Sequence, residues 1–329
     1  MLHAPRAPHP SASAPASPLS RRALRPAGAP EPRAMSLEGP VGAGKTTLIR
    51  SVLAAVSARG LRAVYIPEPV EEWERVGALQ RFYVGCQARA DGRAETPEEA
   101  EERRAHAAYE FQTYTFTTRV EASLGAYEAD AAADLYITER TVLTDRHVFM
   151  ELQRDLVGPQ LMEMYERWWG LYDRLMPFDL GRALYLYLRP SVGACMARVA
   201  RRARGGEVAE EGAARAAEPD DKGAGGVSAA YQQRLLAAHD AFLIGEPGAR
   251  SEFPEMPEPP FDRARSVLVV GGGLADGDFS EAGEHRDAVV GAVLAKMAAH
   301  WPELAPALLG APKDALAPTP RLTAQPAAV

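Results

Sequence analysis

The sequence predicts an α/β protein in which a parallel sheet of five strands carries helices on both faces. Short apolar segments alternate with longer segments of helical spacing, a pattern typical of strands joined by crossover helices. A glycine-rich loop of phosphate-binding type follows the first of these strands. The predicted strands lie at residues 35–37, 63–66, 135–138, 183–188 and 266–270.

The glycine-rich loop fits the pattern Gly-x-x-x-x-Gly-Lys-Ser/Thr at every fixed position. In such loops the main-chain N–H groups point at phosphate oxygens, the lysine reaches the outer phosphates, and the Ser/Thr hydroxyl can bind Mg²⁺. A chance glycine-rich turn is the alternative, but it does not account for the strand before the loop or the helix predicted at 45–57. We therefore expect a phosphate-loop NTPase fold whose nucleotide contacts are Gly39, Pro40, Val41, Gly42, Ala43, Gly44, Lys45 and Thr46.

The composition excludes several classes of protein. The net charge of −7 argues against a general nucleic-acid binder, which would carry a basic excess. No apolar segment approaches the roughly 20 residues of a membrane span, so an integral membrane protein is not expected. Cys86 and Cys195 are far apart and lack ligand spacing, which argues against disulfides and zinc and favours a reducing compartment such as the cytoplasm.

Both ends of the chain are rich in alanine and proline and are predicted to be disordered tails, at residues 1–32 and 304–329. The first tail is also rich in arginine and poor in acids, so a mitochondrial or plastid transit peptide stays open, although its prolines would break an amphipathic helix. The domain between the tails, residues 33–303, is expected to carry insertions near 88–107 and 208–225.

Charged residues follow two of the predicted strands. Pro67 cannot continue the ladder, so the chain leaves the sheet there and Glu68 should lie near the phosphate loop, at the carboxyl edge of the sheet. Glu139 and Arg140 end the third strand, where a carboxylate can position Mg²⁺ and an arginine can neutralise a transferred phosphoryl group. The simpler alternatives are a solvated loop acid for Glu68 and ordinary ion pairing for the other two.

Three further features have both a structural and a functional interpretation. Gln112 and Arg119 are seven residues apart and share one face of a predicted helix, where they are either surface polar groups or ligand contacts. Trp168 and Trp169 lie in a predicted helix at 156–175, as core or subunit-interface residues. An arginine cluster follows the fourth strand, either as a solvated face or as a lid that closes on triphosphate. Its members are Arg198, Arg201, Arg202 and Arg204.

Five motifs occur in the order found in the deoxyribonucleoside kinase family, which the chain resembles from about Ala34 to Trp301. They are residues 39–47, 68–73, 111–114, 139–146 and 195–204. The resemblance implies a five-stranded parallel sheet with an arginine-rich lid, a homodimer, and transfer of the γ-phosphoryl group of ATP to a nucleoside 5′-hydroxyl in nucleotide salvage.

The same resemblance implies the roles of individual residues. Glu68 matches the general base, and Arg140 and Lys45 match the cations that steady the phosphates. Thr46 and Glu139 match the Mg²⁺ partners. The implied nucleoside contacts are Glu68 and Arg140, Trp73 as a pocket wall, Gln112 as the reader of the base, Tyr83 with Glu207 at the 3′-hydroxyl, and Arg119 with Asp145. The implied ATP contacts beyond the loop are Thr47, the lid residues Arg198, Arg202 and Arg204, and Asp278 with Phe279.

Arg119 and Asp145 bear on substrate preference. An aspartate paired with an arginine can accept a hydrogen bond from an exocyclic amine and disfavours a carbonyl, so deoxycytidine or a purine deoxynucleoside is expected. The pair resembles that of the deoxycytidine and deoxyguanosine kinase branch. Asp145-Arg146-His147 also resembles herpesviral thymidine kinases, so a thymidine kinase is the second hypothesis.

Two functions of other classes stay open. A nucleotide-dependent switch toward a protein partner would need no residue that reads the base. A nucleoside monophosphate kinase would place the Glu68 carboxylate beside the phosphate of its acceptor, a repulsion that such a site should avoid.

Overall fold

The computed structural model describes residues 31–85, 95–202, 227–280 and 282–310. Within these ranges five parallel strands form one sheet in the order β2-β3-β1-β4-β5. The predicted α/β fold is therefore confirmed. The strands are β1 (Ala34–Glu38), β2 (Ala63–Ile66), β3 (Leu135–Glu139), β4 (Leu184–Arg189) and β5 (Val267–Gly271).

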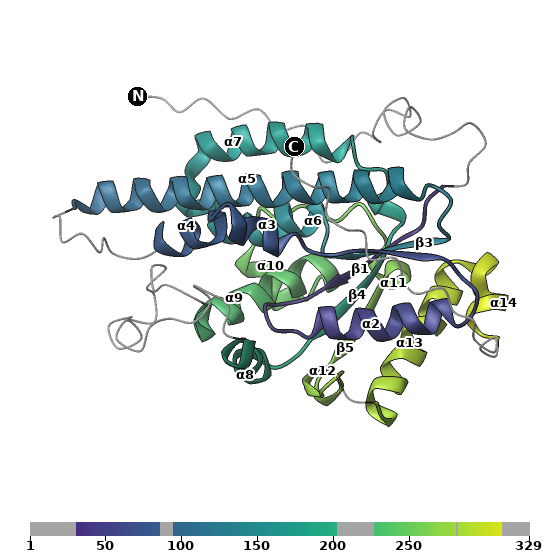
Figure 1. Ribbon diagram of the computed structural model, residues 1–329. Coiled ribbons are helices and arrows are strands. Elements are labelled where there is room, and N and C mark those ends of the chain that lie inside the picture. Colours follow the sequence, from purple (N-terminus) through teal and green to yellow (C-terminus); the bar gives the residue numbers. More distant parts are fainter. Residues whose placement is uncertain (1–30, 86–94, 203–226, 281, 311–329) are drawn as a thin grey trace.

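Helices cover both faces of the sheet (Figure 1). Successive strand residues point to opposite faces, so each strand feeds two cores. In β1, Met35 and Leu37 pack beneath α2 (Lys45–Ser57) and α13 (Glu284–His300). Ala34 faces the other core, which is formed with the larger helical layer. That layer contains α5 (Pro97–Ala129), α7 (Arg154–Asp173) and α9 (Ala229–His239).

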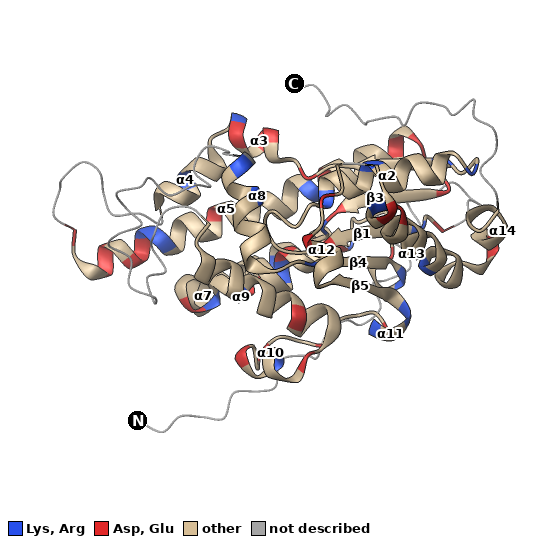
Figure 2. Ribbon diagram, turned by 90° about the horizontal axis from the view of Figure 1, so that it is seen from below, with Lys and Arg blue, Asp and Glu red and all other residues tan. Residues whose placement is uncertain are grey.

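Helix α5 spans 33 residues and carries part of the predicted insertion. Residues 86–94 of that segment lie outside the described residues, whereas 97–107 form the first turns of α5. The helix begins with a capping box between Thr96 and Glu99, and its first turns carry exposed charged residues (Figure 2). These turns therefore extend the helix that delivers Gln112 and Arg119 to the site. The other predicted insertion, 208–225, lies outside the described residues.

Helix α7 contains a break near its start that the predicted continuous helix did not include. Gly158 has φ 75° and ψ 169°, and Pro159 follows it. Because proline disfavours a helical conformation in the residue before it, the chain turns at this point and resumes as a helix. The helix predicted at 227–243 corresponds to α9 followed by a π-helical turn over Asp240–Ile244.

Short helices complete the fold. Among the helices that the structure describes, none is both long enough and apolar enough to cross a membrane. The remaining α-helices are α3 (Val70–Arg75), α4 (Ala78–Gly85), α6 (Val142–Thr144), α8 (Val192–Arg202), α10 (Pro247–Glu252), α11 (Arg263–Ser266), α12 (Gly273–Asp276) and α14 (Ala305–Leu308). The other helical turns cover Asp145–Phe149, Glu151–Gln153, Leu180–Arg182 and Pro302–Leu304.

The predicted start of the C-terminal tail at residue 304 is wrong. Residues 302–308 are helical, and the side chains of Leu304 and Leu308 are buried against the core beneath α13. Leu308 also accepts a hydrogen bond at its carbonyl oxygen from Arg59 Nε, at 2.8 Å. The prediction failed because it was based on the alanine- and proline-rich composition of this segment. Two leucines four residues apart suffice to bury one face of a short helix, whatever the composition around them.

Candidate active site

The phosphate loop connects the central strand β1 to α2, at the point where the strand order reverses. Strand β1 lies between β3 and β4: from β1 the chain runs to β2 on one side of the sheet, and from β3 it crosses β1 to reach β4 on the other side. In an open α/β sheet this switch point is where ligands bind, outside the carboxyl ends of the strands. The residues predicted after β1, β2 and β3 therefore converge on one edge of the sheet.

The loop backbone favours glycine at three positions, of which Gly42 is at a variable position of the motif. Gly39, Gly42 and Gly44 have φ values of 140°, 79° and 92°. A Cβ on Gly42 would lie 2.6 Å from the carbonyl oxygen of Cys195 in α8, and a Cβ on Gly39 would collide with the carbonyl oxygen of Leu188. Side chains at these positions would be both strained and obstructed.

Lys45 and Arg140 both bond the carbonyl oxygen of Gly39 in the loop. Lys45 Nζ donates to the carbonyl oxygens of Gly39 and Pro40, at 3.3 and 3.1 Å. Arg140 Nη1 donates to the same Gly39 oxygen at 2.9 Å. Arg140 has a φ of 63°, a left-handed conformation that costs a non-glycine residue roughly 1–2 kcal/mol. Strain of this kind persists where the surrounding structure fixes a functional residue.

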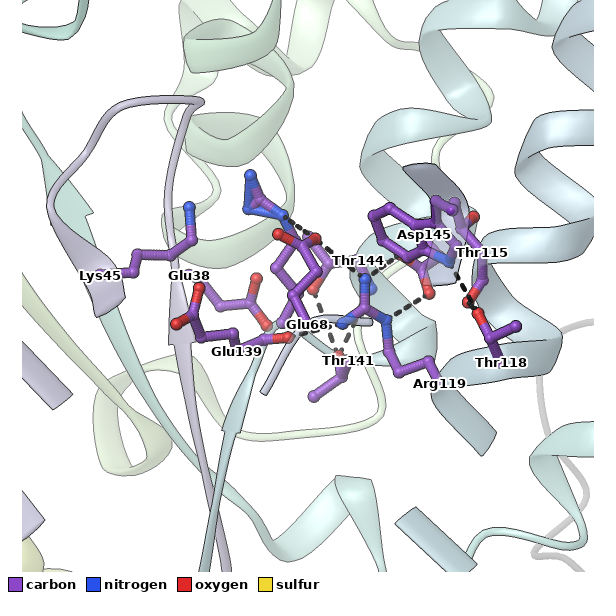
Figure 3. A network of polar contacts seen from close by, with 12 residues as sticks. Glu38, Lys45, Glu68, Thr115, Thr118, Arg119, Glu139, Thr141, Thr144 and Asp145 are labelled. Atoms are coloured by element: carbon purple, nitrogen blue, oxygen red, sulfur yellow. Dashed lines mark hydrogen bonds and ion pairs between the residues drawn. The ribbon is translucent and has the colours of Figure 1, made fainter. Parts of the chain in front are cut away.

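Glu68 lies between Arg140, which bonds the phosphate loop, and Arg119, which pairs with Asp145. Its Oε1 atom lies 3.2 Å from Arg140 Nε and 3.2 Å from Arg119 Nη2. Arg119 in turn forms a bidentate ion pair with Asp145. Its Nε donates to Oδ2 at 2.7 Å, and its Nη2 donates to Oδ1 at 3.1 Å. In Figure 3, Lys45, Glu139 and Glu68 lie on one side of Arg119, and Asp145 lies on the other.

The arginines keep Glu68 ionised. Burial alone would raise the pKa of Glu68, but Arg140, Arg119 and then Lys45 outweigh it and lower the pKa to about 2. The opposite holds for the loop lysine. Burial and the neighbouring Arg140 lower the pKa of Lys45 to about 7, so an anionic ligand is needed to hold its full positive charge at neutral pH.

Glu139 has the donor chemistry that Mg²⁺ prefers. Mg²⁺ commonly takes one or two protein oxygens and fills its remaining positions with phosphate and water oxygens. Glu139 is buried at the end of β3, and its Oε1 accepts a hydrogen bond from Tyr65 Oη at 2.6 Å. Thr46, in the first turn of α2, is exposed. Among the described residues, no cluster of three or more metal-binding side chains occurs.

Three residues predicted to contact the nucleoside, Gln112, Arg119 and Trp73, lie on α5 or pack against it. Gln112 and Arg119 are both buried on α5. Trp73 is buried and packs edge-to-face on Phe111, with ring centroids 5.7 Å apart. Its Nε1 donates to Thr118 Oγ1 at 2.9 Å, which ties α3 to the same helix. The structure therefore brings a hydrophobic wall and a polar helix face together beside Glu68.

Four other predicted site residues lie on α4, at the end of α8 or outside the described residues. They are Tyr83, Arg202, Arg204 and Glu207. Tyr83 is half-buried on α4, with its ring 5.6 Å from that of Phe82. Arg202 is the last residue of α8, and Arg204 and Glu207 lie outside the described residues. The predicted pairing of Tyr83 with Glu207 therefore stays a prediction.

Arg198, one of the predicted lid arginines, bonds main-chain oxygens of two segments. Its Nη1 donates to the carbonyl oxygens of Gly42 and Ala43, at 3.3 and 3.1 Å. Its Nη2 donates to those of Ala275 and Gly277, at 2.9 and 2.8 Å. Arg198 thus fastens the phosphate loop to the turn after α12.

Asp278 and Phe279 follow that turn. The buried Phe279 ring lies against the phosphate loop, since a Cβ on Gly44 would be 3.1 Å from its Cδ2 atom. Asp278 is exposed and accepts hydrogen bonds from the N–H and the hydroxyl of Ser280. The structure therefore places this predicted pair next to the loop.

A model of the deoxynucleoside kinase family matches residues 35–211, more than half of the 329 residues. The chain belongs to this family. Membership implies deoxynucleoside kinase activity, and the resemblance drawn from the five motifs is confirmed at that level. No curated protein matches the chain.

The sequence analysis missed three residues of the kinase site. Glu38 is completely buried at the end of β1, Tyr65 bonds Glu139, and Gln232 Nε2 in α9 donates to Val41 O of the phosphate loop at 2.7 Å. A glutamate directly before the loop was a signal for Glu38. Nothing local marks Gln232, because its contact spans 191 residues of sequence.

Glu38 adds a fourth carboxyl group to a buried cluster that contains three cations. Among the described residues, the cluster contains the carboxyl groups of Glu38, Glu68, Glu139 and Asp145 and the cations Lys45, Arg119 and Arg140. Glu38 Oε1 accepts a hydrogen bond from Ser36 Oγ at 2.6 Å, whereas its Oε2 is buried without a partner. Burial raises the pKa of Glu38 to about 7, against the opposing effect of Ser36.

We predict that Glu38→Gln stabilises the kinase at alkaline but not at acidic pH. The pKa of Glu38 is raised on folding from 4.5 to about 7, so its contribution to stability is fully present below 4.5 and is lost as pH rises through 7. At about 1.4 kcal/mol per pKa unit, the variant should gain up to roughly 3 kcal/mol at pH 8 relative to pH 4.5. Urea unfolding at both pH values measures this difference.

The exposed Glu74, on α3, supplies the control. Glu74→Gln should change the free energy of unfolding equally at the two pH values. An equal effect of Glu38→Gln at both pH values would show that folding does not raise the pKa of Glu38.

Proposed function

We propose that the protein transfers the γ-phosphoryl group of ATP to the 5′-hydroxyl of a deoxyribonucleoside, with deoxycytidine or a purine deoxynucleoside preferred. The observation that carries this proposal is the position of Glu68. Its carboxylate bonds Arg140, and Arg140 also bonds the carbonyl oxygen of Gly39 in the phosphate loop. A carboxylate held beside a triphosphate cradle can receive an alcohol that is aimed at the terminal phosphorus.

Glu68 acts on the acceptor in this mechanism. It is ionised at neutral pH and accepts a hydrogen bond from the 5′-hydroxyl, whose proton it takes as the new P–O bond forms. Its low pKa in the free protein depends on Arg140 and Arg119. When ATP draws Arg140 toward its phosphates, Glu68 loses part of that stabilisation and becomes a stronger base.

The cations act on the donor. Lys45 and Arg140 turn from loop carbonyl oxygens to the phosphates and stabilise negative charge on the transferred group. Glu139 and Thr46 are the residues proposed to hold Mg²⁺ with the nucleotide. The ion, when bound, neutralises charge on the phosphate oxygens and helps align them.

The base preference is proposed from Arg119 and Asp145. Their bidentate ion pair is buried beside Glu68 and holds the Asp145 carboxylate in one orientation. A fixed carboxylate can accept from an exocyclic amine and repels a carbonyl oxygen. The adjacent residues of the thymidine-kinase-like motif face elsewhere: Arg146 pairs with Glu151 at 3.1 Å, and the His147 ring stacks on Phe242 at 4.9 Å.

We also propose that the kinase is a homodimer that pairs through α7. Four large apolar side chains are each 43–51 % exposed. Those at positions 164, 168 and 171 share one face of α7, and that at position 175 lies in the turn that follows the helix. The four are Met164, Trp168, Leu171 and Leu175. Figure 1 shows α7 on the outside of the layer formed with α5, where a second copy can reach it. A contiguous apolar face of this kind is typical of a protein interface.

Replacing Glu68 tests its role as the base. We expect Glu68→Gln to lower kcat by roughly 10²–10⁴, the usual effect of losing a general base, while nucleoside affinity changes only a few-fold. Steady-state kinetics and calorimetric titration measure the two quantities. Glu74→Gln, at an exposed glutamate in the helix α3 that follows Glu68, should leave both unchanged, and near-full turnover of Glu68→Gln would remove Glu68 from this role.

A competition assay tests the substrate preference. With ATP and Mg²⁺, the purified protein should phosphorylate deoxycytidine or a purine deoxynucleoside with a kcat/KM at least roughly tenfold above that for thymidine, since mismatched polar groups are left unpaired in a buried site. A preference for thymidine would show that the Arg119–Asp145 pair does not disfavour a carbonyl group on the base. It would leave the kinase assignment intact.

Sedimentation velocity tests the dimer. Trp168→Glu places a charge in the centre of the apolar face of α7, so we expect it to convert a dimer to monomers at micromolar concentration. Leu309→Glu, at a leucine that is 66 % exposed on a different part of the surface, is the matched control and should not change the mass. A Trp168→Glu variant that remains dimeric would exclude this interface.

A further inference from the structure

Tyr65 reaches the Glu139 carboxylate from the neighbouring strand. In the parallel pairing of β2 with β3, Tyr65 lies opposite Ile137, and Glu139 is two residues farther along the same face. Such diagonal positions are about 7–8 Å apart, a span that an aromatic side chain bridges. The Tyr65 hydroxyl donates to Glu139 Oε1 at 2.6 Å.

This contact lies on the face of the sheet that α2 covers. Tyr65 and Ile137 belong to the core formed with α2, the helix that carries Lys45 and Thr46 in its first turn. Tyr65 is 7 % and Glu139 5 % exposed, so the hydrogen bond is shielded from water. A hydrogen bond to an ionised acceptor in such surroundings is stronger than one at the surface.

We infer that Tyr65 is a positioning residue, which holds the Glu139 carboxylate in the orientation that binds the divalent cation of the nucleotide. The inference rests on the proposed function, in which Glu139 is a metal partner. Residues that hydrogen-bond metal-binding carboxylates from behind fix their orientation, and losing one commonly costs 10–100-fold in metal affinity. Phenylalanine would fill the same space but would leave the carboxylate free to turn.

The hydrogen bond from Tyr65 matters because Lys45 could otherwise attract the Glu139 carboxylate. Glu139 is close enough to act electrostatically on Lys45, and Figure 3 draws both side chains on the same side of Arg119, so an unrestrained carboxylate has a cation to turn toward. An ion pair between them would remove a metal ligand and a phosphate-binding cation at once. The Tyr65 hydroxyl, by occupying Oε1, opposes that rearrangement.

A purely structural role for the hydroxyl makes a different prediction. If it only satisfies a buried carboxylate, its removal should lower stability and leave metal binding unchanged. Tyr185 provides a control of that kind, because its buried hydroxyl donates to the carbonyl oxygen of Leu180 at 2.7 Å, away from the phosphate loop.

The test is Mn²⁺ binding in the presence of a non-hydrolysable ATP analogue, followed by the electron paramagnetic resonance of free Mn²⁺. We expect Tyr65→Phe to weaken Mn²⁺ binding by roughly 10–100-fold, Tyr185→Phe to leave it within twofold of wild type, and thermal melting to show both variants folded. In Glu139→Gln, which weakens Mn²⁺ binding by itself, adding Tyr65→Phe should cause little further loss because the two residues act as one unit.

Either of two results would overturn the inference. Tyr65→Phe could bind Mn²⁺ as tightly as wild type, or its loss could persist undiminished in the Glu139→Gln background. Failure of the proposed function is distinguishable from both, since it would appear as a wild-type protein that binds the metal–nucleotide normally but phosphorylates no deoxynucleoside.

Discussion

The guanidinium of Arg140 holds the two halves of the active site together. One nitrogen bonds the carbonyl oxygen of Gly39 in the phosphate loop, and another bonds Glu68 after β2. Its left-handed backbone conformation turns the chain sharply after Glu139, so neighbouring residues of one strand end can serve different parts of the site. The strain at Arg140 is the local cost of placing a carboxylate beside a phosphate cradle.

The close packing around the phosphate loop imposes a second constraint. Main-chain atoms of β4 and α8 approach Gly39 and Gly42 so closely that no side chain fits there. Arg198 and Gln232 then bond carbonyl oxygens of the loop from α8 and α9. Helices that come much later in the chain therefore fix the conformation of the loop before a ligand binds. This reduces the conformational entropy that the loop would lose on binding a triphosphate.

Burying so many charges together opposes folding. Arg119 and Asp145 compensate each other, and Glu68 is compensated by two arginines. Lys45 and Glu38 are left with pKa values displaced toward neutrality by burial. Displaced groups of this kind cluster at functional sites. The negative charge of a nucleotide would favour the protonated form of Lys45, whereas it would disfavour the ionised form of Glu38.

The sequence by itself determined the order of strands and helices, the phosphate loop and the kinase family, because these depend on local periodicity and on a motif of contiguous residues. It also indicated Glu68, Glu139 and Arg140, since parallel strands must end at one edge. Only the tertiary structure decided that Arg119 links Glu68 to Asp145, that Tyr65 bonds Glu139 and that Arg198 clamps the loop. These contacts join residues 26 to 155 positions apart, and pairing over such separations is set by strand register and helix packing, which a local pattern does not encode.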